Sequence, residues 1–312
     1  MIAAPGFPQS EESIAFLEAL DDLLVKHCDS AALRAAWDTT EARIPGLWKR
    51  LDDLGLFDFV TERGLMDGLG DAVAAAVVLG RYAAPEPFLG SLAASVLTGK
   101  PTPMETAVVG RPGSLVVDAS VASQFVIAST DGGFEVVLRS DLTVTRVPSI
   151  DPSARLGTID RTHNTAEGQQ LDVMTTLAAA ALQGLAEGLL SQTVEYARLR
   201  EQFGKPIGSF QAIKHHLADV YTALAFSRPV IEDAARSVWH PHWSARASHA
   251  KVAATSAAHR AARTALQVHG GIGYTFEHDL HMWTKKVWTL STAWGDSRWH
   301  AARMAAAALA EE

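Results

Sequence analysis

One stretch of the sequence brings an arginine, an aromatic ring and two glycines together where one helical pattern gives way to another. It reads RLREQFGKPIGSFQ and runs from Arg198 to Gln211. Gly204 and Gly208 permit a tight turn, and the planar guanidinium of Arg200 can hold a phosphate or a carboxylate through two parallel hydrogen bonds. A plain helix–turn–helix corner with a solvated arginine accounts for the same residues, so both interpretations stay open.

A second stretch places paired glycines at the end of an alanine-rich helical pattern. It reads LQVHGGIGYT from Leu266 to Thr275, with Gly270 and Gly271 at its centre. Because glycine has no Cβ, a flat or anionic ligand can approach the backbone closely at such a pair. A helix that ends at its C-cap glycine explains the pair equally well.

Other kinds of catalytic or metal site lack their residues. His215 and His216 are neighbours on a predicted helix, so they point about 100° apart and cannot chelate one ion. No other pair of histidines has Cys, Asp or Glu at the spacing of metal ligands. The sequence has no G-x-S-x-G motif, and the dipeptide Gly204-Lys205 lacks the glycine loop of a phosphate-binding P-loop. We therefore expect no metal site and no nucleophile of these classes.

The elements that must position the two stretches begin with helices. Apolar residues recur every three or four positions in 10–26, 44–54 and 71–82. Ser10 is a suitable N-cap for the first of these helices, which has acids in its first turn. The second helix should stop at Gly55.

A small β block follows the helices. From 106 to about 159 the residues become β-branched and turn residues come close together. Asp131-Gly132-Gly133, between two apolar runs, is typical of a hairpin turn. A block of about fifty residues can form a small sheet or a half-barrel, not a large one. The expected strands are the runs AVVG, SLVVDA, QFVIAST, GFEVVLR and TVTRV.

The last part of the chain is helical again. Helical patterns cover 172–199, 209–235, 243–269 and 296–309, and Pro229 predicts a kink or a break in the second of them. Long alanine-rich helices pack closely, so a bundle is expected. The predicted fold class is therefore mainly α with a small β middle domain. The predicted domains are an N-terminal α-helical domain (1–98), a reduced β domain (99–170) and a C-terminal α-helical bundle (171–312).

The charge and composition of the chain exclude some classes of binding partner. The 312 residues carry 27 basic and 35 acidic side chains, a formal net charge of −8, without a basic block. Nucleic acid and anionic membrane surfaces are therefore poor partners. No uninterrupted apolar run reaches the roughly 20 residues of a membrane span, and the N-terminus does not read as a signal peptide. The single cysteine, Cys28, cannot form an internal disulfide, and we expect a cytoplasmic protein.

Together the two stretches resemble the acyl-CoA dehydrogenase family. YARLREQFGKPIGSFQ (196–211) is similar to the family pattern of an aromatic residue followed by R-x-x-F-G-x-x-[IL]-x-x-x-Q, and QVHGGIGYT (267–275) is similar to Q-x-x-G-G-x-G-[YF]. They occur in the family's order and at about its separation, and LWKRLDDLGLFDF (47–59) resembles its opening helices. The resemblance implies an acyl-CoA dehydrogenase-like fold, with a helical N-terminal domain, a β middle domain and a C-terminal four-helix bundle.

The resemblance also implies FAD as a cofactor that is shared across a subunit interface. In the family one subunit offers its β domain to the flavin, and its neighbour supplies residues of both motifs. An arginine suits the pyrophosphate, a phenylalanine can pack against an apolar ring, and glycines bring backbone N–H groups close to the ligand. Carried onto this sequence, the cofactor-binding residues are Arg200, Phe203, Gln211, Gln267, Gly270 and Gly271.

The catalytic base of the family is missing from its expected positions. The family's reaction abstracts an α-proton and transfers a β-hydride to the flavin, which requires a carboxylate. The usual Glu-Gly position falls on Trp294-Gly295, and the position used by some members falls on Met174. Neither Trp nor Met can take the proton, so we predict no catalytic residue. The carboxylates that remain as alternatives nearby in the sequence are Asp172, Glu187 and Asp296.

The middle segment departs from the family as well. The flavin-holding stretches T-E-P/G-x-G-S-D and W-I-[TS] are absent between 100 and 165, where the closest aromatic, Phe125, lacks the pattern. A chain that keeps the groups facing a neighbour but lacks those of its own site is what a heteromer predicts. We expect a non-catalytic subunit of an α2β2 complex that completes the FAD site of a catalytic acyl-CoA dehydrogenase subunit. It resembles the paired actinobacterial subunits that oxidise steroid side-chain CoA thioesters.

The resemblance implies further partners and leaves two alternatives. The acyl-CoA substrate would lie mainly in the partner subunit, and electron-transferring flavoprotein is the family's usual electron acceptor. One alternative is a self-sufficient acyl-CoA dehydrogenase with a displaced base. The other is a flavin-free binding or scaffold protein on the same helical frame.

Overall fold

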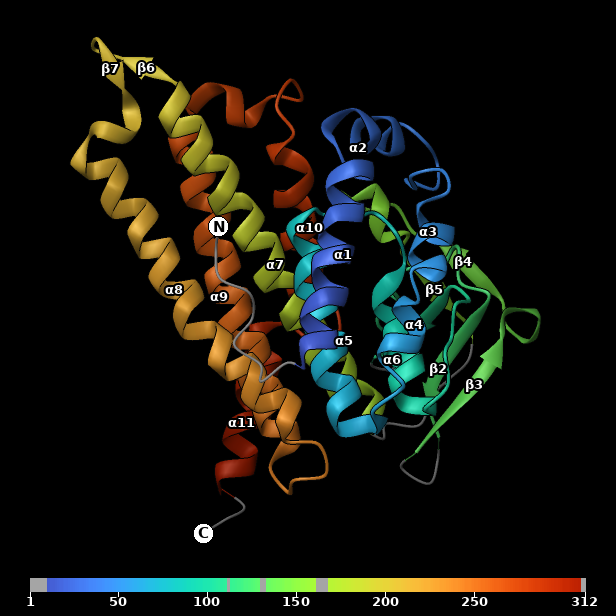
Figure 1. Ribbon diagram of the computed structural model, residues 1–312. Helices are drawn as coiled ribbons and strands as arrows, with labels where there is room; N and C mark the ends of the chain where they lie inside the picture. The colour runs from blue at the N-terminus through green and yellow to red at the C-terminus, as the bar shows by residue number, and fades with distance from the viewer. Residues whose placement is uncertain (1–9, 111–112, 130–132, 161–167, 310–312) are drawn as a thin grey trace.

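Helices dominate both ends of the chain in the computed structural model, which describes residues 10–110, 113–129, 133–160 and 168–309. From α8 and α9 at one side, the layers run through α7 and α5 to α6 and the β-sheet at the other side (Figure 1). The predicted class, mainly α with a small β part, is confirmed. The helices of the N-terminal part are α1 Glu11–His27, α2 Ser30–Trp37, α3 Leu47–Asp53, α4 Leu56–Phe59, α5 Gly64–Arg81 and α6 Phe88–Thr98.

Local signals set the start and end of several of these helices. The Ser10 hydroxyl accepts a hydrogen bond from the Ser13 backbone N–H, so the predicted N-cap of α1 is confirmed. The predicted stop at Gly55 is also confirmed, because this residue has a φ of 85°. The sequence patterns missed α2 and α6. The nine residues from Phe88 to Val96 in α6 are all buried, so α6 has no polar stripe that would reveal its helical period.

The β block consists of small sheets. Strand β1 (Thr106–Val108) pairs in parallel with β2 (Gln124–Ala128), which pairs antiparallel with β3 (Phe134–Leu138). Strands β4 (Val144–Arg146) and β5 (Gly157–Ile159) form a separate antiparallel pair. Asp131 and Gly132 of the predicted Asp131-Gly132-Gly133 turn lie outside the described residues.

The expected strand SLVVDA is wrong. Only Val116 forms a bridge, to Gly157, and the chain then turns at Asp118, which has a φ of 62°. The Asp118 carbonyl accepts hydrogen bonds from the backbone N–H groups of Val121 and Ala122. Because this turn uses the backbone groups of the segment, they cannot join a longer ladder.

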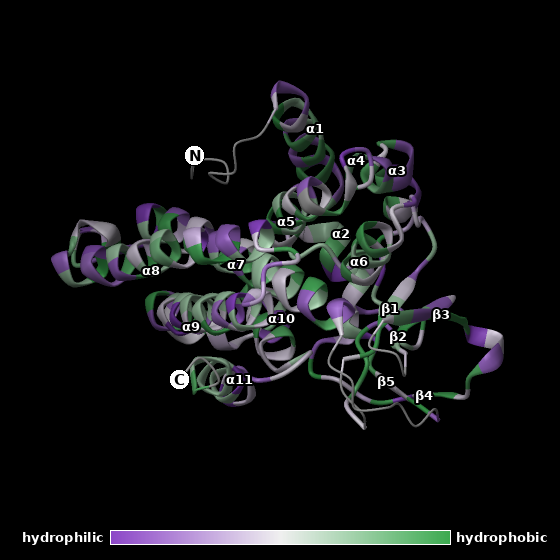
Figure 2. Cartoon of the chain, turned by 90° about the horizontal axis from the view of Figure 1, so that it is seen from below, coloured by the Kyte–Doolittle hydropathy of each residue, from purple (hydrophilic) through white to green (hydrophobic). Residues whose placement is uncertain are grey.

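The C-terminal part forms the predicted bundle. Helix α8 runs through Pro229 without interruption, so of the predicted kink or break the break is wrong. The sequence patterns did not predict α10. Seen from below, the strands gather at the side of the molecule away from α8 and α9 (Figure 2). The helices are α7 Gln169–Leu199, α8 Gln211–Arg236, α9 Trp243–His269, α10 Leu280–Thr292 and α11 Ser297–Leu309. The short elements are β6 Glu201–Gln202, β7 Lys205–Pro206 and the 3-10 turns η1 Arg139–Asp141, η2 Pro152–Ala154, η3 Ile207–Ser209 and η4 Gly270–Tyr274.

Helix α7 is the central element of the bundle and contacts α5, α8, α9 and α10. It is the one described helix that is long and apolar enough to cross a membrane by length and composition, but every residue of its apolar window is buried inside the protein. Its glycines permit close packing on α5. A Cβ at Gly184 would lie 2.0 Å from the Val77 carbonyl oxygen, and one at Gly188 would lie 2.3 Å from that of Arg81. The apolar composition of α7 therefore reflects helix packing.

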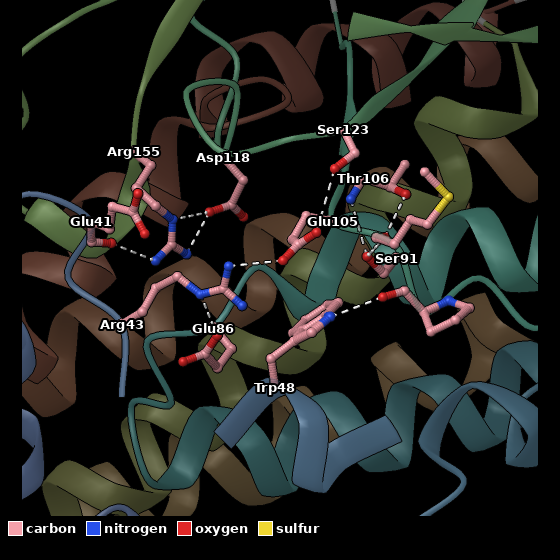
Figure 3. Close-up of polar contacts among 12 residues, drawn as sticks. Glu41, Arg43, Trp48, Glu86, Ser91, Glu105, Thr106, Asp118, Ser123 and Arg155 are labelled. Atoms are coloured by element: carbon pink, nitrogen blue, oxygen red, sulfur yellow. Dashed lines mark hydrogen bonds and ion pairs between the residues drawn. The ribbon is translucent and has the colours of Figure 1, made fainter. Parts of the chain in front are cut away.

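Buried charges join the N-terminal helices to the β block (Figure 3). The guanidinium of Arg155, a residue that is 2% exposed, donates to the Asp118 carboxylate at 2.6 and 2.8 Å and to the backbone carbonyls of Glu41, Ala42 and Pro85. Burial raises the pKa of the Asp118 carboxyl, and the adjacent guanidinium opposes that rise. Beside this pair, Arg43 bonds Glu86 and Glu105 at 2.8 and 2.9 Å.

Removal of the Arg155 guanidinium should therefore destabilise the whole chain. We expect Arg155→Met to lower the free energy of unfolding by about 3–5 kcal/mol, because it leaves the Asp118 carboxylate buried without its partner. Urea denaturation of the full chain measures this change. Arg155→Met combined with Asp118→Leu should recover part of the loss. The exposed pair of Lys49 and Asp53 supplies a control, since Lys49→Ala should cost about 0.5 kcal/mol. A loss below about 1 kcal/mol in Arg155→Met would show that the pair is not needed.

Candidate functional site

The two stretches singled out in the sequence lie at the same end of the bundle (Figure 1). The first connects α7 to α8 through β6, β7 and η3, and the second follows α9 as η4. The rings of Tyr196 and His269 stack with their centroids 4.2 Å apart, and the Tyr196 hydroxyl donates to the His269 carbonyl at 3.5 Å. Since Tyr196 precedes Arg200 by one helical turn and His269 precedes Gly270, this stack holds the two stretches together.

The first stretch is a tight hairpin that exposes an aromatic ring. Glu201 and Gln202 pair with Pro206 and Lys205, and the chain reverses at Phe203 and Gly204, which have φ values of 54° and 75°. Such paired left-handed residues are typical of a two-residue hairpin turn, although a phenylalanine rarely adopts this conformation. The Phe203 side chain is 91% exposed. The hairpin thus holds an apolar ring in solvent.

The predicted tight turn at Gly204 is confirmed, whereas Gly208 has another role. A Cβ at Gly208 would lie 3.0 Å from the Ala197 carbonyl oxygen, so this glycine permits close packing of the corner on α7. Arg200 and Gln211 are exposed, and the structure shows no ion pair for the Arg200 guanidinium among the residues that it describes. Both side chains are therefore available to a ligand.

The second stretch offers open backbone. Gly270 has a φ of 63°, and a Cβ at either Gly270 or Gly271 would meet no atom within 4 Å. The Gln267 side chain is exposed on the last turn of α9. An arginine, an exposed ring, two amides and a bare glycine pair therefore surround one end of the bundle. This set can bind an anionic ligand that also has a flat ring, such as a dinucleotide.

Sequence reasoning missed two imidazoles beneath this end, of which His269 is buried and His278 is half-buried. The His269 Nδ1–H donates to the Ala265 carbonyl at 2.8 Å, while its Nε2 has no partner among the described atoms. The His278 ring lies 4.6 Å from the His269 ring, and burial lowers the pKa of both imidazoles. Tyr196 and His269 stand inside the quoted motifs, but no sequence signal indicates that residues 73 positions apart stack on each other.

The position expected for a catalytic base holds a buried indole. Trp294 is 7% exposed, has a φ of 57° and donates from Nε1 to the Val108 carbonyl of β1 at 2.9 Å. A cavity of about 290 Å3 lies beside it. The side chain of Met174, at the other expected position, is fully buried. The cavity lining includes Leu115, Val117, Leu156, Thr289, Trp294 and Gly295.

The carboxylates considered as substitutes all have structural partners. Asp172 binds Arg303 and Ser244, each at 2.6 Å. Glu187 binds Arg81 and Arg228 at 3.2 and 2.9 Å. Asp296 is exposed and accepts from the Trp299 backbone N–H as the cap of α11. Within the described ranges no group of three His, Cys, Asp or Glu side chains could hold a metal ion.

A buried cation supports the loop that bears Trp294. The Lys251 ammonium donates to the Leu290 and Ala293 carbonyls, each at 2.7 Å, and burial lowers its pKa to about 7. Nearby, the His300 ring lies 3.1 Å from the Ser248 hydroxyl oxygen. Burial, and after it the charge of Lys251, lower the pKa of His300 to about 3.

The buried His300 should make stability fall in acid. Its pKa is about 3 in the folded chain against 6.5 for a solvent-exposed imidazole, so the unfolded state binds more protons between these values. Its contribution to stability is complete above about pH 6.5 and is lost as the pH falls toward 3, with a slope of at most about 1.4 kcal/mol per pH unit. We expect His300→Gln to flatten the measured slope between pH 6 and 4, relative to wild type, in urea titrations. His215→Gln, on the exposed side of α8, is the control for loss of an imidazole, and equal slopes in wild type and His300→Gln would contradict the assignment.

Comparison with known proteins identifies relatives across nearly the whole chain. Residues 165–309 match the family model "Acyl-CoA dehydrogenase, C-terminal domain". The chain is 34% identical to acyl-CoA dehydrogenase IpdE2 of Mycobacterium tuberculosis over 295 residues, which cover 89% of this chain and 91% of that protein.

Solved structures share the fold at lower identity. A variant of the Tcur3481-Tcur3483 steroid ACAD has a TM-score of 0.83 at 23% identity and covers 96% of this chain and 98% of that one. The ChsE4-ChsE5 complex from Mycobacterium tuberculosis has a TM-score of 0.82 at 23% identity and covers 98% of this chain and 99% of that one. The predicted acyl-CoA dehydrogenase-like fold is confirmed.

Proposed function

Because this chain belongs to the acyl-CoA dehydrogenase family of FAD-binding oxidoreductases, we propose that it is a non-catalytic subunit that completes the FAD site of a catalytic partner. The observation that carries the proposal is Trp294. An indole, hydrogen-bonded to β1 and buried, stands where the α-proton of the substrate would need a carboxylate. Met174 offers no base at the other position.

The exposed end of the bundle fits the pyrophosphate and ring of FAD. Arg200 would neutralise the pyrophosphate, Phe203 would pack against an apolar ring, and the backbone at Gly270 and Gly271 would approach the ligand without a side chain between them. These groups face away from the core, as residues that serve a neighbouring subunit must. The FAD would supply the hydride acceptor, and the partner would supply the base and the β-domain face.

The substrate class follows from the family and its neighbours. We propose an acyl-CoA thioester bound mainly in the partner, with a steroid side-chain CoA as the first compound to test, because one structural neighbour is a steroid ACAD. The heteromer proposal is supported by the ChsE4-ChsE5 complex among the neighbours. We further propose α2β2 stoichiometry, a cytoplasmic location and electron-transferring flavoprotein as the acceptor.

The alternative of a displaced base has less support, since Asp172, Glu187 and Asp296 are engaged in ion pairs or a helix cap. Its test is to make Asp172→Asn, Glu187→Gln and Asp296→Asn singly in whichever preparation, the single chain or the complex, shows turnover. Loss of turnover with retained fold and flavin in one of them would make that carboxylate the base. The flavin-free alternative predicts no cofactor in any preparation.

The flavin spectrum of the purified chain, alone and after co-expression with a catalytic acyl-CoA dehydrogenase subunit, tests the proposal directly. We expect a colourless single chain and a yellow complex with about one FAD per heterodimer, because one half of each site is missing from either chain. A yellow and active single chain would overturn the non-catalytic assignment.

Arg200→Ala should weaken FAD binding in the complex. Loss of a charge-assisted hydrogen bond to the pyrophosphate is expected to raise the Kd for FAD roughly 10- to 100-fold. Fluorescence titration of the apo complex measures this, and Arg198→Ala, an exposed arginine two residues earlier on α7, is the matched control. Equal FAD affinity in Arg200→Ala and wild type would exclude Arg200 from the cofactor site.

A further inference from the structure

An apolar cavity lies beside the glycine pair, on the side of η4 that faces α10. It has a volume of about 140 Å3. Gly273 and Tyr274 line it and belong to η4 together with Gly270 and Gly271, and Leu266 lines it next to Gln267. The cavity is therefore lined by close chain neighbours of the residues that the proposed function assigns to FAD.

Three large aromatic side chains around this cavity are exposed. Tyr274 is 75% exposed, Phe276 is 70% exposed and Trp288 is 41% exposed. Exposed aromatic side chains that gather around a pocket mark interaction sites, and Trp and Tyr are enriched among residues that dominate binding energy. The aromatic rim and the cavity together form a unit that we call the η4 socket.

The η4 socket is already held in shape. Arg34 of α2 donates to the Phe276 and Glu277 carbonyls at 2.9 and 2.6 Å and pairs with Asp279 at 2.5 Å. The His281 ring packs edge-on against Phe276 at 4.9 Å. Because these contacts fix the loop before any partner arrives, docking would cost little conformational entropy.

The size and chemistry of the η4 socket favour an apolar side chain over a nucleotide base. An apolar cavity of about 150 Å3 accepts a benzene ring, so 140 Å3 suits one large apolar side chain. The hydroxyls of Thr275 and Thr284 already donate to the Ile272 and Leu280 carbonyls. Among the described side-chain atoms that line the socket, the His281 Nδ1 is buried without a hydrogen-bond partner. One such atom cannot satisfy the several hydrogen-bonding groups of adenine.

The rim of the η4 socket carries a cation without a carboxylate partner. The Lys285 ammonium lies 4.6 Å from the centroid of Phe276 and 5.4 Å from that of Trp37, and no described carboxylate pairs with it. A partner segment with an acid beside its apolar side chain would complement this charge.

We infer that the η4 socket receives one large apolar side chain of the catalytic partner subunit, and that a carboxylate beside it on that subunit pairs with Lys285. The inference rests on the proposed function and names the contact that anchors the two subunits next to the shared cofactor. Its expected effect is on subunit affinity and not on the chemistry of the flavin.

Two substitutions test the η4 socket in the heteromer formed with the catalytic subunit. Trp288→Glu should raise the Kd between the subunits at least about 30-fold, because it places a charge in an apolar contact. Lys285→Glu should raise it roughly 5- to 10-fold by opposing the partner's acid. Sedimentation equilibrium with excess FAD measures the Kd. At subunit concentrations well above that Kd, the FAD content per heterodimer should equal that of wild type.

The controls separate folding from docking. Trp288→Phe keeps an aromatic wall and should bind within about threefold of wild type. Trp239→Glu introduces the same change at an exposed tryptophan in the α8–α9 connection, at the opposite end of the bundle, and should leave the Kd unchanged (Figure 1).

The remaining outcomes overturn the inference in distinguishable ways. Wild-type affinity in Trp288→Glu, in a pair that associates and binds FAD, would reject the η4 socket and leave the proposed function standing. If Trp288→Glu leaves the affinity between the flavin-free subunits normal but weakens FAD binding, the cavity belongs to the cofactor instead. A wild-type pair that neither associates nor binds FAD would reject the proposed function, and the η4 socket with it.

Discussion

The buried guanidinium of Arg155 is the interaction on which the arrangement of the molecule depends. It is the point at which the loop before α3, the segment between α5 and α6, and the β block meet. A charge inside a protein is tolerated only when its hydrogen bonds are satisfied, so the position of each acceptor is constrained by the same fork of donors. The adjacent pairing of Arg43 with Glu86 and Glu105 extends this constraint along the junction. These polar contacts add to the apolar ones, because Val108, Val117 and Val126 of the β block also pack into the core of the helices.

The bundle depends on a different constraint, the close approach of α7 to its neighbours. Glycines at 184 and 188 allow the backbone of α5 to lie almost against that of α7. With α7 enclosed on its sides, its C-terminal end is where the chain can leave the core, and the exposed hairpin at Phe203 begins there. The stack of Tyr196 on His269 then fixes this end against the end of α9. The result is an end of the bundle at which Arg200, Phe203 and Gln267 are exposed.

The position where the family has its catalytic base lies inside the molecule. Trp294 is hydrogen-bonded to β1, and the turn that bears it rests on the buried ammonium of Lys251. Trp294 therefore lines the cavity of about 290 Å3 between the bundle and the β block with a buried indole, which has no group that could take a proton. The exposed groups at the end of the bundle and the indole at Trp294 are the two features on which the proposed function rests.

The sequence by itself determined the order of the elements and the two motifs, because helical periodicity, β-branched runs and glycine pairs are local properties. It therefore predicted α1, α7, α9 and the turn at Gly204 well. The replacement of the family's acid by Trp294 stays a prediction. The sequence failed for α6 and α10, whose buried or mixed surfaces hide the helical period, and for SLVVDA, where a turn at Asp118 overrides strand propensity. Only the tertiary structure brought Arg155 to Asp118, Tyr196 to His269 and the rings of Tyr274, Phe276 and Trp288 around one cavity. These pairings join residues far apart in the chain, and the free energy that selects them comes from burial and hydrogen bonding in the complete fold.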